Sequence, residues 1–295
     1  MTAFSATDAA FEGFRLTRER PRVVLVWAAL CFLVSVCSAI YLTTAGREAA
    51  ALLEAGANEQ TPDPAAFAEM MGVLFPMMIV GLLLQCVMAA AVYRVILRPQ
   101  EEGLAYLKLG MDEVRLAALT FIYVVLAVLA LVGAVLVAGV IAAIVMGVAG
   151  QGAGTMMAVV IEFFILGLLF FFAVRLSLAP AITFAERRLA IFDSWKLTHG
   201  QFWRLTGAYG LAICGIAAMA ILVLVIFTAA VAIAKGGDIQ AAGAFFNPDS
   251  SSLRAYFSLT TVLYLVVSAW LSALYYAVVI APAAVAYRTL SGQAD

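Results

Sequence analysis

Six long apolar stretches constrain what this chain can fold into. They cover residues 22–44, 68–97, 116–148, 156–180, 204–234 and 255–288. A helix needs roughly 20 mostly apolar residues to cross the hydrocarbon core of a bilayer, and each stretch is long enough. Hydrophobic residues make up 65% of the chain and charged residues 12%, which is far from the composition of a soluble domain. The sequence therefore predicts an all-α integral membrane protein, with six transmembrane helices in a single domain over residues 1–295.

The basic residues indicate the direction of the spans. All but three of the 17 precede an odd-numbered span or follow an even-numbered one, and the exceptions are Arg47, Lys235 and Arg254. Because basic loops stay on the cytoplasmic side, we expect both termini to be cytoplasmic. The formal net charge of −1 gives no reason to expect a nucleic acid as partner.

Recurring sequence patterns predict an internal repeat. A large apolar residue, a base, a leucine and a small residue precede each odd-numbered span, at residues 14–17, 107–110 and 195–198. A proline lies at or near the end of each even-numbered span: Pro99, Pro180 and Pro282. We predict three tandem units of an amphipathic helix and a hairpin, over approximately 5–99, 100–182 and 184–290, with pseudo-threefold symmetry about the membrane normal. The alternative is that membrane borders favour such residues in any case.

The segments before the odd-numbered spans, around 5–18, 100–112 and 184–199, mix apolar and basic residues. We predict short helices near the cytoplasmic interface, whose bases attract anionic headgroups. The alternative is a packed connector with ordinary positive-inside charge. The candidate headgroup contacts are Arg94, Arg98, Lys108, Arg115, Arg175, Arg187, Arg188, Lys196, His199 and Arg204.

The stretches Arg175–Glu186 and Phe192–Arg204 carry a resemblance to a known family. Its features are Pro180, Glu186, Ser194, Trp195, Leu197, Gly200 and Phe202 to Arg204. The pattern resembles the membrane domain attached to some bacterial glycerophosphodiester phosphodiesterases, and related uncharacterised six-span bacterial membrane proteins. The resemblance implies a multi-pass protein of the bacterial inner (cytoplasmic) membrane. It does not imply hydrolysis, because the soluble barrel with its acidic metal ligands and histidines has no counterpart in this sequence.

The sequence contains no recognisable set of catalytic residues. His199 is the only histidine, and Asp193 and Ser194 lie too far back along a helix to align with it as a triad. No phosphate-binding loop, zinc-protease motif or nucleophile elbow occurs. The four cysteines lie in apolar stretches without a CxxC pair, which is typical of buried small side chains. We predict no catalytic residue, metal or cofactor.

Glu162 is a carboxyl group inside the fourth apolar stretch. A charge in hydrocarbon costs about 3 kcal/mol or more, so we expect Glu162 to face other helices. It is either a functional proton or cation site, or a structural residue that lies near the outer interface or pairs with a hydroxyl group.

Two hypotheses for function follow. The first is a non-enzymatic membrane protein that acts through contacts with lipids, anionic ones included, or with a membrane-protein partner, as an accessory, scaffold or assembly component. The alternative is a transporter of a small solute, ion or lipid-like molecule that uses the bundle interior around Glu162. A wet cavity that reaches Glu162 would favour the transporter.

Overall fold

The computed structural model describes residues 4–47, 64–238, 248–249 and 252–292, and within these ranges it contains helices and no strand. Six of the described helices are long and apolar enough to cross a membrane. They are α2 (Pro21–Thr44), α4 (Pro64–Leu97), α5 (Met111–Ala149), α6 (Gln151–Leu176), α9 (Phe202–Ala234) and α12 (Leu259–Leu290). The predicted all-α, six-span fold is therefore confirmed.

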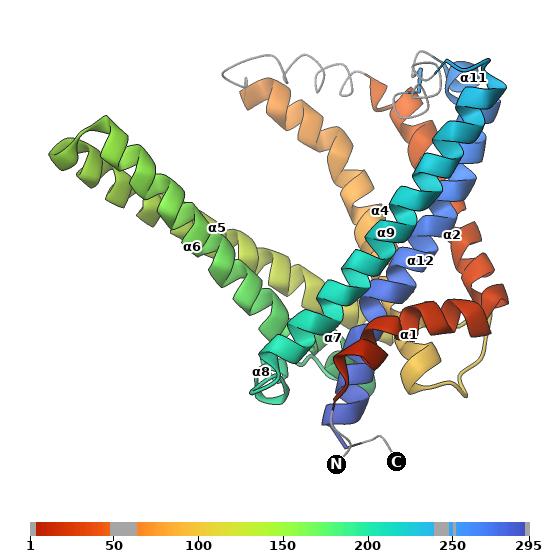
Figure 1. Ribbon diagram of the computed structural model, residues 1–295, viewed down its shortest axis with the longest axis horizontal. Helices are drawn as coiled ribbons and strands as arrows, with labels where there is room; N and C mark the ends of the chain where they lie inside the picture. The colour runs from red at the N-terminus through yellow and green to blue at the C-terminus, as the bar shows by residue number, and fades with distance from the viewer. Residues whose placement is uncertain (1–3, 48–63, 239–247, 250–251, 293–295) are drawn as a thin grey trace. The chain divides into compact units, whose positions relative to one another are not determined.

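Four shorter helices complete the described structure (Figure 1). They are α1 (Ala6–Glu19), α7 (Ala179–Glu186), α8 (Ser194–Leu197) and α11 (Leu253–Tyr256). The first predicted amphipathic segment is α1, and its 14 residues match the predicted range closely.

The chain divides into two compact units. We call the first the hairpin unit, which consists of Met1–Ala6, Leu109–Gly207 and Ala283–Asp295. We call the second the bundle unit, which consists of Thr7–Lys108 and Ala208–Pro282. This division does not follow the borders of the three predicted repeats, and the pseudo-threefold symmetry stays a prediction.

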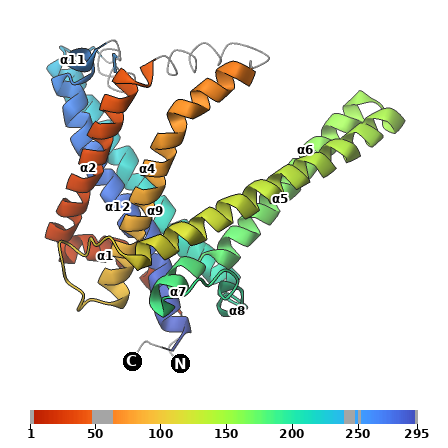
Figure 2. The ribbon, with the colours of Figure 1, turned by 180° about the vertical axis from the view of Figure 1, so that it is seen from behind.

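In the hairpin unit, α5 and α6 run antiparallel and side by side (Figures 1 and 2). Gly150 joins them with a φ of 90°, a conformation that glycine adopts without a steric penalty. The helices approach closely at Gly154, where a Cβ atom would lie 2.7 Å from Met146 Cβ. Most other side chains of the pair are exposed and apolar, as suits helices surrounded by lipid.

In the bundle unit, α1 packs against α9 and α12. The core of this contact consists of Ala10, Ala212, Ile216, Leu274 and Val278, with Phe14, Met219, Trp270 and Val279 around it. A Cβ atom on Gly13 would lie 2.4 Å from Val278 Cα and 2.5 Å from the Ala277 carbonyl oxygen. Glycine at this position therefore allows α1 to rest directly on the backbone of α12.

The second and third amphipathic segments differ from the prediction. Residues 98–110 form a loop and not a helix, because Ala105 and Tyr106 have φ angles of 51° and 62°, which no α-helix contains. In the third segment, α7 ends at Glu186 and only the four residues of α8 are helical before α9 begins.

The three prolines at the ends of the even-numbered spans occupy different positions. Pro99 follows α4, Pro180 lies in the first turn of α7, and Pro282 lies inside α12. The helix α12 continues past Pro282 to Leu290, which agrees with the predicted sixth span of residues 255–288.

We expect the substitution Gly13→Ala to destabilise the protein by about 1–3 kcal/mol, because the new Cβ atom overlaps backbone atoms that cannot rotate away. Thermal unfolding of the purified protein in detergent measures this change. Gly210→Ala is the matched control, since nothing lies within 4 Å of a Cβ atom there. Equal stability of the two variants would show that α1 does not rest on α12.

Candidate lipid-headgroup interface

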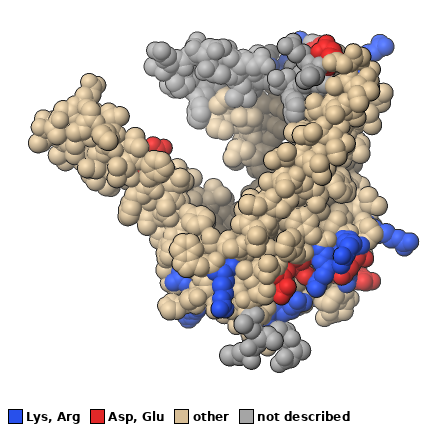
Figure 3. Space-filling view, in the orientation of Figure 1, with Lys and Arg blue, Asp and Glu red and all other residues tan. Residues whose placement is uncertain are grey.

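On the face that Figure 3 shows, charged side chains gather near helix ends, and the middle parts of the long helices carry almost no charge. Six of the ten predicted headgroup residues are exposed: Lys108, Arg187, Arg188, Lys196, His199 and Arg204. Arg98 and Arg115 are half-buried, whereas Arg94 and Arg175 are buried. The ten predicted residues therefore differ in how far their side chains reach the surface.

The hairpin unit places most of the exposed bases in one segment, residues 187–204. Arg187 ends α7 in the left-handed conformation with a φ of 55°. Arg188 then donates to Glu186 at 2.7 Å and to Asp193 at 2.6 Å. These two carboxylates are the only acidic residues between positions 175 and 204, which also include five Lys and Arg residues. The segment therefore carries an excess of positive charge.

Aromatic side chains lie within this basic segment and beside it. The ring of Phe171 lies 5.4 Å from that of Phe202 and 5.9 Å from that of Trp195, measured between centroids. Phe192 and Trp203 are exposed, Trp203 by 79% of its surface. Tryptophan and basic residues at the end of a transmembrane helix are the side chains that prefer the headgroup region.

Arg175 stabilises the protein instead of contacting headgroups, which corrects the sequence prediction. Its Nη1 atom donates to Thr198 Oγ1 at 3.2 Å, and its guanidinium carbon lies 4.5 Å from the centroid of the Trp195 ring. Its carbonyl oxygen accepts a hydrogen bond of 2.7 Å from Ser194 Oγ. Because α8 folds over this side chain, Arg175 fastens α8 to the end of α6.

The predicted headgroup contact of Arg94 does not fit the structure either, because this side chain is buried. Its side chain is 2% exposed, and Nη1 donates to the carbonyl oxygen of Tyr106 at 3.0 Å. The indole nitrogen of Trp27 donates to the neighbouring carbonyl oxygen of Ala105 at 2.9 Å. A left-handed conformation costs of order 1–3 kcal/mol for each non-glycine residue. These two hydrogen bonds hold Ala105 and Tyr106 in that conformation.

The Tyr106 side chain completes the loop of residues 98–110. Its hydroxyl group accepts a hydrogen bond from Arg20 and lies 3.1 Å from both the Pro99 carbonyl oxygen and Glu102 Oε1, to either of which it can donate. Burial raises the pKa of Tyr106 above its usual value, and the hydrogen bond with Glu102 adds to the rise. The phenol therefore keeps its proton at neutral pH. Nothing in the sequence around Tyr106 indicates this role.

The remaining predicted headgroup residues form ion pairs near the surface. Arg98 and Lys108 lie 3.7 Å and 3.9 Å from Glu101, and Arg115 lies 2.9 Å from Asp112. Such partly exposed pairs contribute up to about 1 kcal/mol each. They leave the bases accessible at one side.

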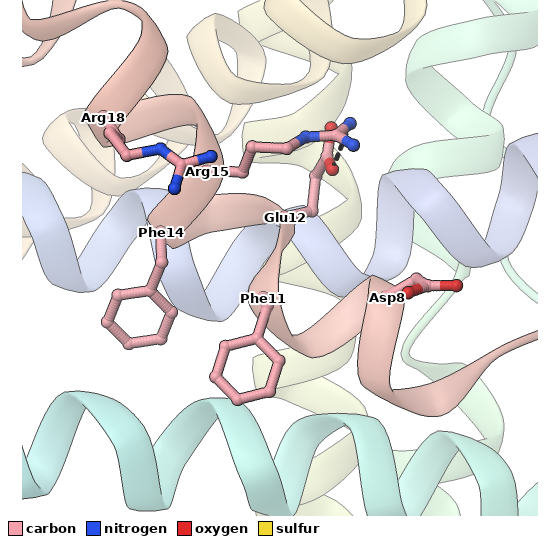
Figure 4. Close-up of a pocket in the computed structure, with 6 residues that line it drawn as sticks. All are labelled: Asp8, Phe11, Glu12, Phe14, Arg15 and Arg18. Atoms are coloured by element: carbon pink, nitrogen blue, oxygen red, sulfur yellow. Dashed lines mark ion pairs between the residues drawn. The ribbon is translucent and has the colours of Figure 1, made fainter.

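In the bundle unit, α1 also combines charged and aromatic side chains at its surface. A shallow cavity of about 410 Å³ is lined by Asp8, Phe11, Glu12, Phe14, Arg15 and Arg18. Figure 4 shows the rings of Phe11 and Phe14 directed to the same side, with Arg15 paired to Glu12. Phe11 is exposed beside these charges. An exposed aromatic ring next to arginines is typical of a helix at a membrane interface.

Glu162 is exposed on α6, which lies against α5 in the hairpin unit (Figures 1 and 2). The expectation that Glu162 faces other helices stays a prediction.

The residues near the single histidine are not arranged as a triad. His199 is exposed, Asp193 binds Arg188, and the Ser194 hydroxyl binds the backbone of α6 and α7. Among the residues that the structure describes, no three His, Cys, Asp or Glu side chains are grouped so that they could hold a metal ion.

The four cysteines are free thiols. Cys31 and Cys86 are buried, as we predicted from the sequence, whereas Cys37 and Cys214 are exposed. No protein-family model, curated protein or solved structure matches this chain significantly.

We expect Thr198→Val to destabilise the protein by about 1–3 kcal/mol, because a buried arginine loses its hydrogen-bond acceptor. Thermal unfolding measures the loss. Thr155→Val is the matched control, since the Thr155 hydroxyl is exposed and bonds only to Gln151 of its own helix. If both variants unfold at the same temperature, Arg175 does not fasten α8.

Proposed function

We propose that this chain is a non-enzymatic, multi-pass protein of a bacterial inner membrane, with both termini cytoplasmic, which acts through contacts with anionic lipid headgroups. In this role it serves as an accessory, scaffold or assembly component for a membrane-protein partner. Six apolar helices of spanning length support the membrane part of the proposal. The resemblance to the phosphodiesterase-associated membrane domain agrees with it and adds no activity.

The basic and aromatic segment of the hairpin unit carries the proposal. Lys196 and Arg204 are exposed, and neither forms an ion pair within the described ranges of the chain. Trp195 and Trp203 lie in the same segment and are also exposed. Each basic residue near an anionic membrane surface contributes about 1 kcal/mol of attraction, so the segment suits negatively charged lipid better than neutral lipid.

The alternative is a transporter, in which Glu162 would have to reach an interior that the solute can enter. The basic and aromatic segment supports the first hypothesis without the need for such an interior.

We expect the double substitution Lys196→Gln and Arg204→Gln to weaken the binding of phosphatidylglycerol about 30-fold, since two contacts of about 1 kcal/mol each are lost. Titration of the purified protein with lipid, followed by native mass spectrometry, gives the affinities. Binding of phosphatidylcholine should stay unchanged.

The matched control is Lys235→Gln with Arg254→Gln, which removes the same charge from the side that we predict to be external. This control should retain the affinity for phosphatidylglycerol. Equal losses in both double variants would mean that net charge alone determines binding, and the proposed surface would then be wrong.

A further inference from the structure

A cavity of about 700 Å³ lies in the bundle unit, where α1 ends, α2 begins and the loop of residues 98–110 folds back. Arg20, Arg22, Val23 and Val26 line it from α2 and the residue before it, and Glu102 and Tyr106 line it from the loop. Its volume falls in the range of about 300–1,000 Å³ that is usual for small-molecule sites.

Two carboxylates, Glu19 and Glu102, and two arginines, Arg20 and Arg22, line the cavity. Glu19 lies 3.9 Å from Arg15 and forms an ion pair with it. Arg20 and Glu102 both bind the Tyr106 hydroxyl, which lies between them. In the part of the chain that the structure covers, neither forms an ion pair, and Arg22 forms none either. Two positive groups and one negative group therefore remain available to a ligand. The complement of this arrangement is a molecule with an anionic and a cationic group.

The loop side of the cavity is held in one conformation before any ligand binds. Tyr106 is 2% exposed, and its backbone is fixed by the hydrogen bonds from Trp27 and Arg94. A site that is already ordered loses little conformational entropy on binding. The hydroxyl of Tyr106 and the carboxylate of Glu102 are thus presented in a defined geometry.

The other wall of the cavity is apolar. Val23 and Val26 lie about one turn apart on α2, the transmembrane helix that begins at Pro21. The cavity therefore lies at the start of a transmembrane span, where the polar part of a lipid meets its acyl chains. A small charged solute would gain nothing from this wall, whereas a lipid would place its glycerol and upper acyl chain there.

We propose that this cavity binds the headgroup of a phospholipid that carries both a phosphate and a primary amine, such as phosphatidylethanolamine. Arg20 and Arg22 bind the phosphate, Glu102 binds the ammonium group, and the two valines contact the start of the acyl chains. Choline has no N–H group to donate to Glu102, and phosphatidylglycerol has no cation. The inference goes beyond the proposed function, because it concerns a different unit, different residues and a different lipid.

Native mass spectrometry of the full chain tests the inference, with phosphatidylethanolamine, phosphatidylcholine and phosphatidylglycerol of identical acyl chains. We expect phosphatidylethanolamine to bind about 10-fold more tightly than phosphatidylcholine. Glu102→Gln should reduce this preference to about twofold or less, because glutamine still accepts the Tyr106 hydrogen bond but has lost its charge.

Substitution of Arg22 tests the phosphate contact. Arg22→Gln should weaken the binding of phosphatidylethanolamine and of phosphatidylcholine about 5-fold to 10-fold. Arg22→Lys should restore most of the affinity, because lysine keeps the positive charge. Arg254→Gln is the control and should change neither affinity. Thermal unfolding verifies that each variant is folded.

Equal binding of phosphatidylethanolamine and phosphatidylcholine by the unchanged protein would overturn the inference, and so would a preference that survives Glu102→Gln. Competition by soluble glycerophosphoethanolamine at the same affinity as the lipid would overturn the choice of a lipid as ligand. The Lys196→Gln and Arg204→Gln variant separates the two proposals. It should lose phosphatidylglycerol and keep its preference for phosphatidylethanolamine, so either proposal can fail without the other.

Discussion

The hydrocarbon interior of a membrane lacks water, and this constraint determines most of the structure. Every backbone N–H and C=O group inside lipid needs a partner within the protein, which a helix supplies along its own length. The chain satisfies this requirement with six long helices of high hydropathy. Irregular backbone and most charged side chains are consequently found near the helix ends, with Glu162 inside α6 as an exception.

The constraint also explains which parts of the fold were predictable from the sequence. Long apolar stretches gave the six spans, and the helix at 5–18 followed from its alternation of apolar and basic residues. Pro282 lies inside the predicted sixth span and inside α12, because a proline within a helix removes one hydrogen bond but does not have to end the helix when packing continues on both sides. Its neighbours Ala281 and Ala283 are buried, so α12 has such packing.

The candidate sites were predictable only in part, because residue type does not fix the direction of a side chain. Arg94 and Arg175 have the same sequence context as the exposed bases, yet one supports the loop before α5 and the other supports α8. Glu162 is exposed on α6, and the residue type alone does not say which helix its carboxyl group faces. Tyr106 has a left-handed backbone conformation, and its hydroxyl group accepts a hydrogen bond from Arg20, which is distant in the sequence. Neither feature can be predicted from the residues next to Tyr106.

The proposed function depends on contact between the segment from Trp195 to Arg204 and anionic headgroups. Photo-crosslinking in native membranes tests it most directly, with a benzophenone amino acid placed at Trp203, and at Val148 on the α5–α6 turn as reference. If the segment contacts these headgroups, the lipid adducts at Trp203 are enriched in anionic phospholipid relative to those at Val148. Adducts with the same lipid composition at both positions, or adducts with protein alone at Trp203, would contradict it.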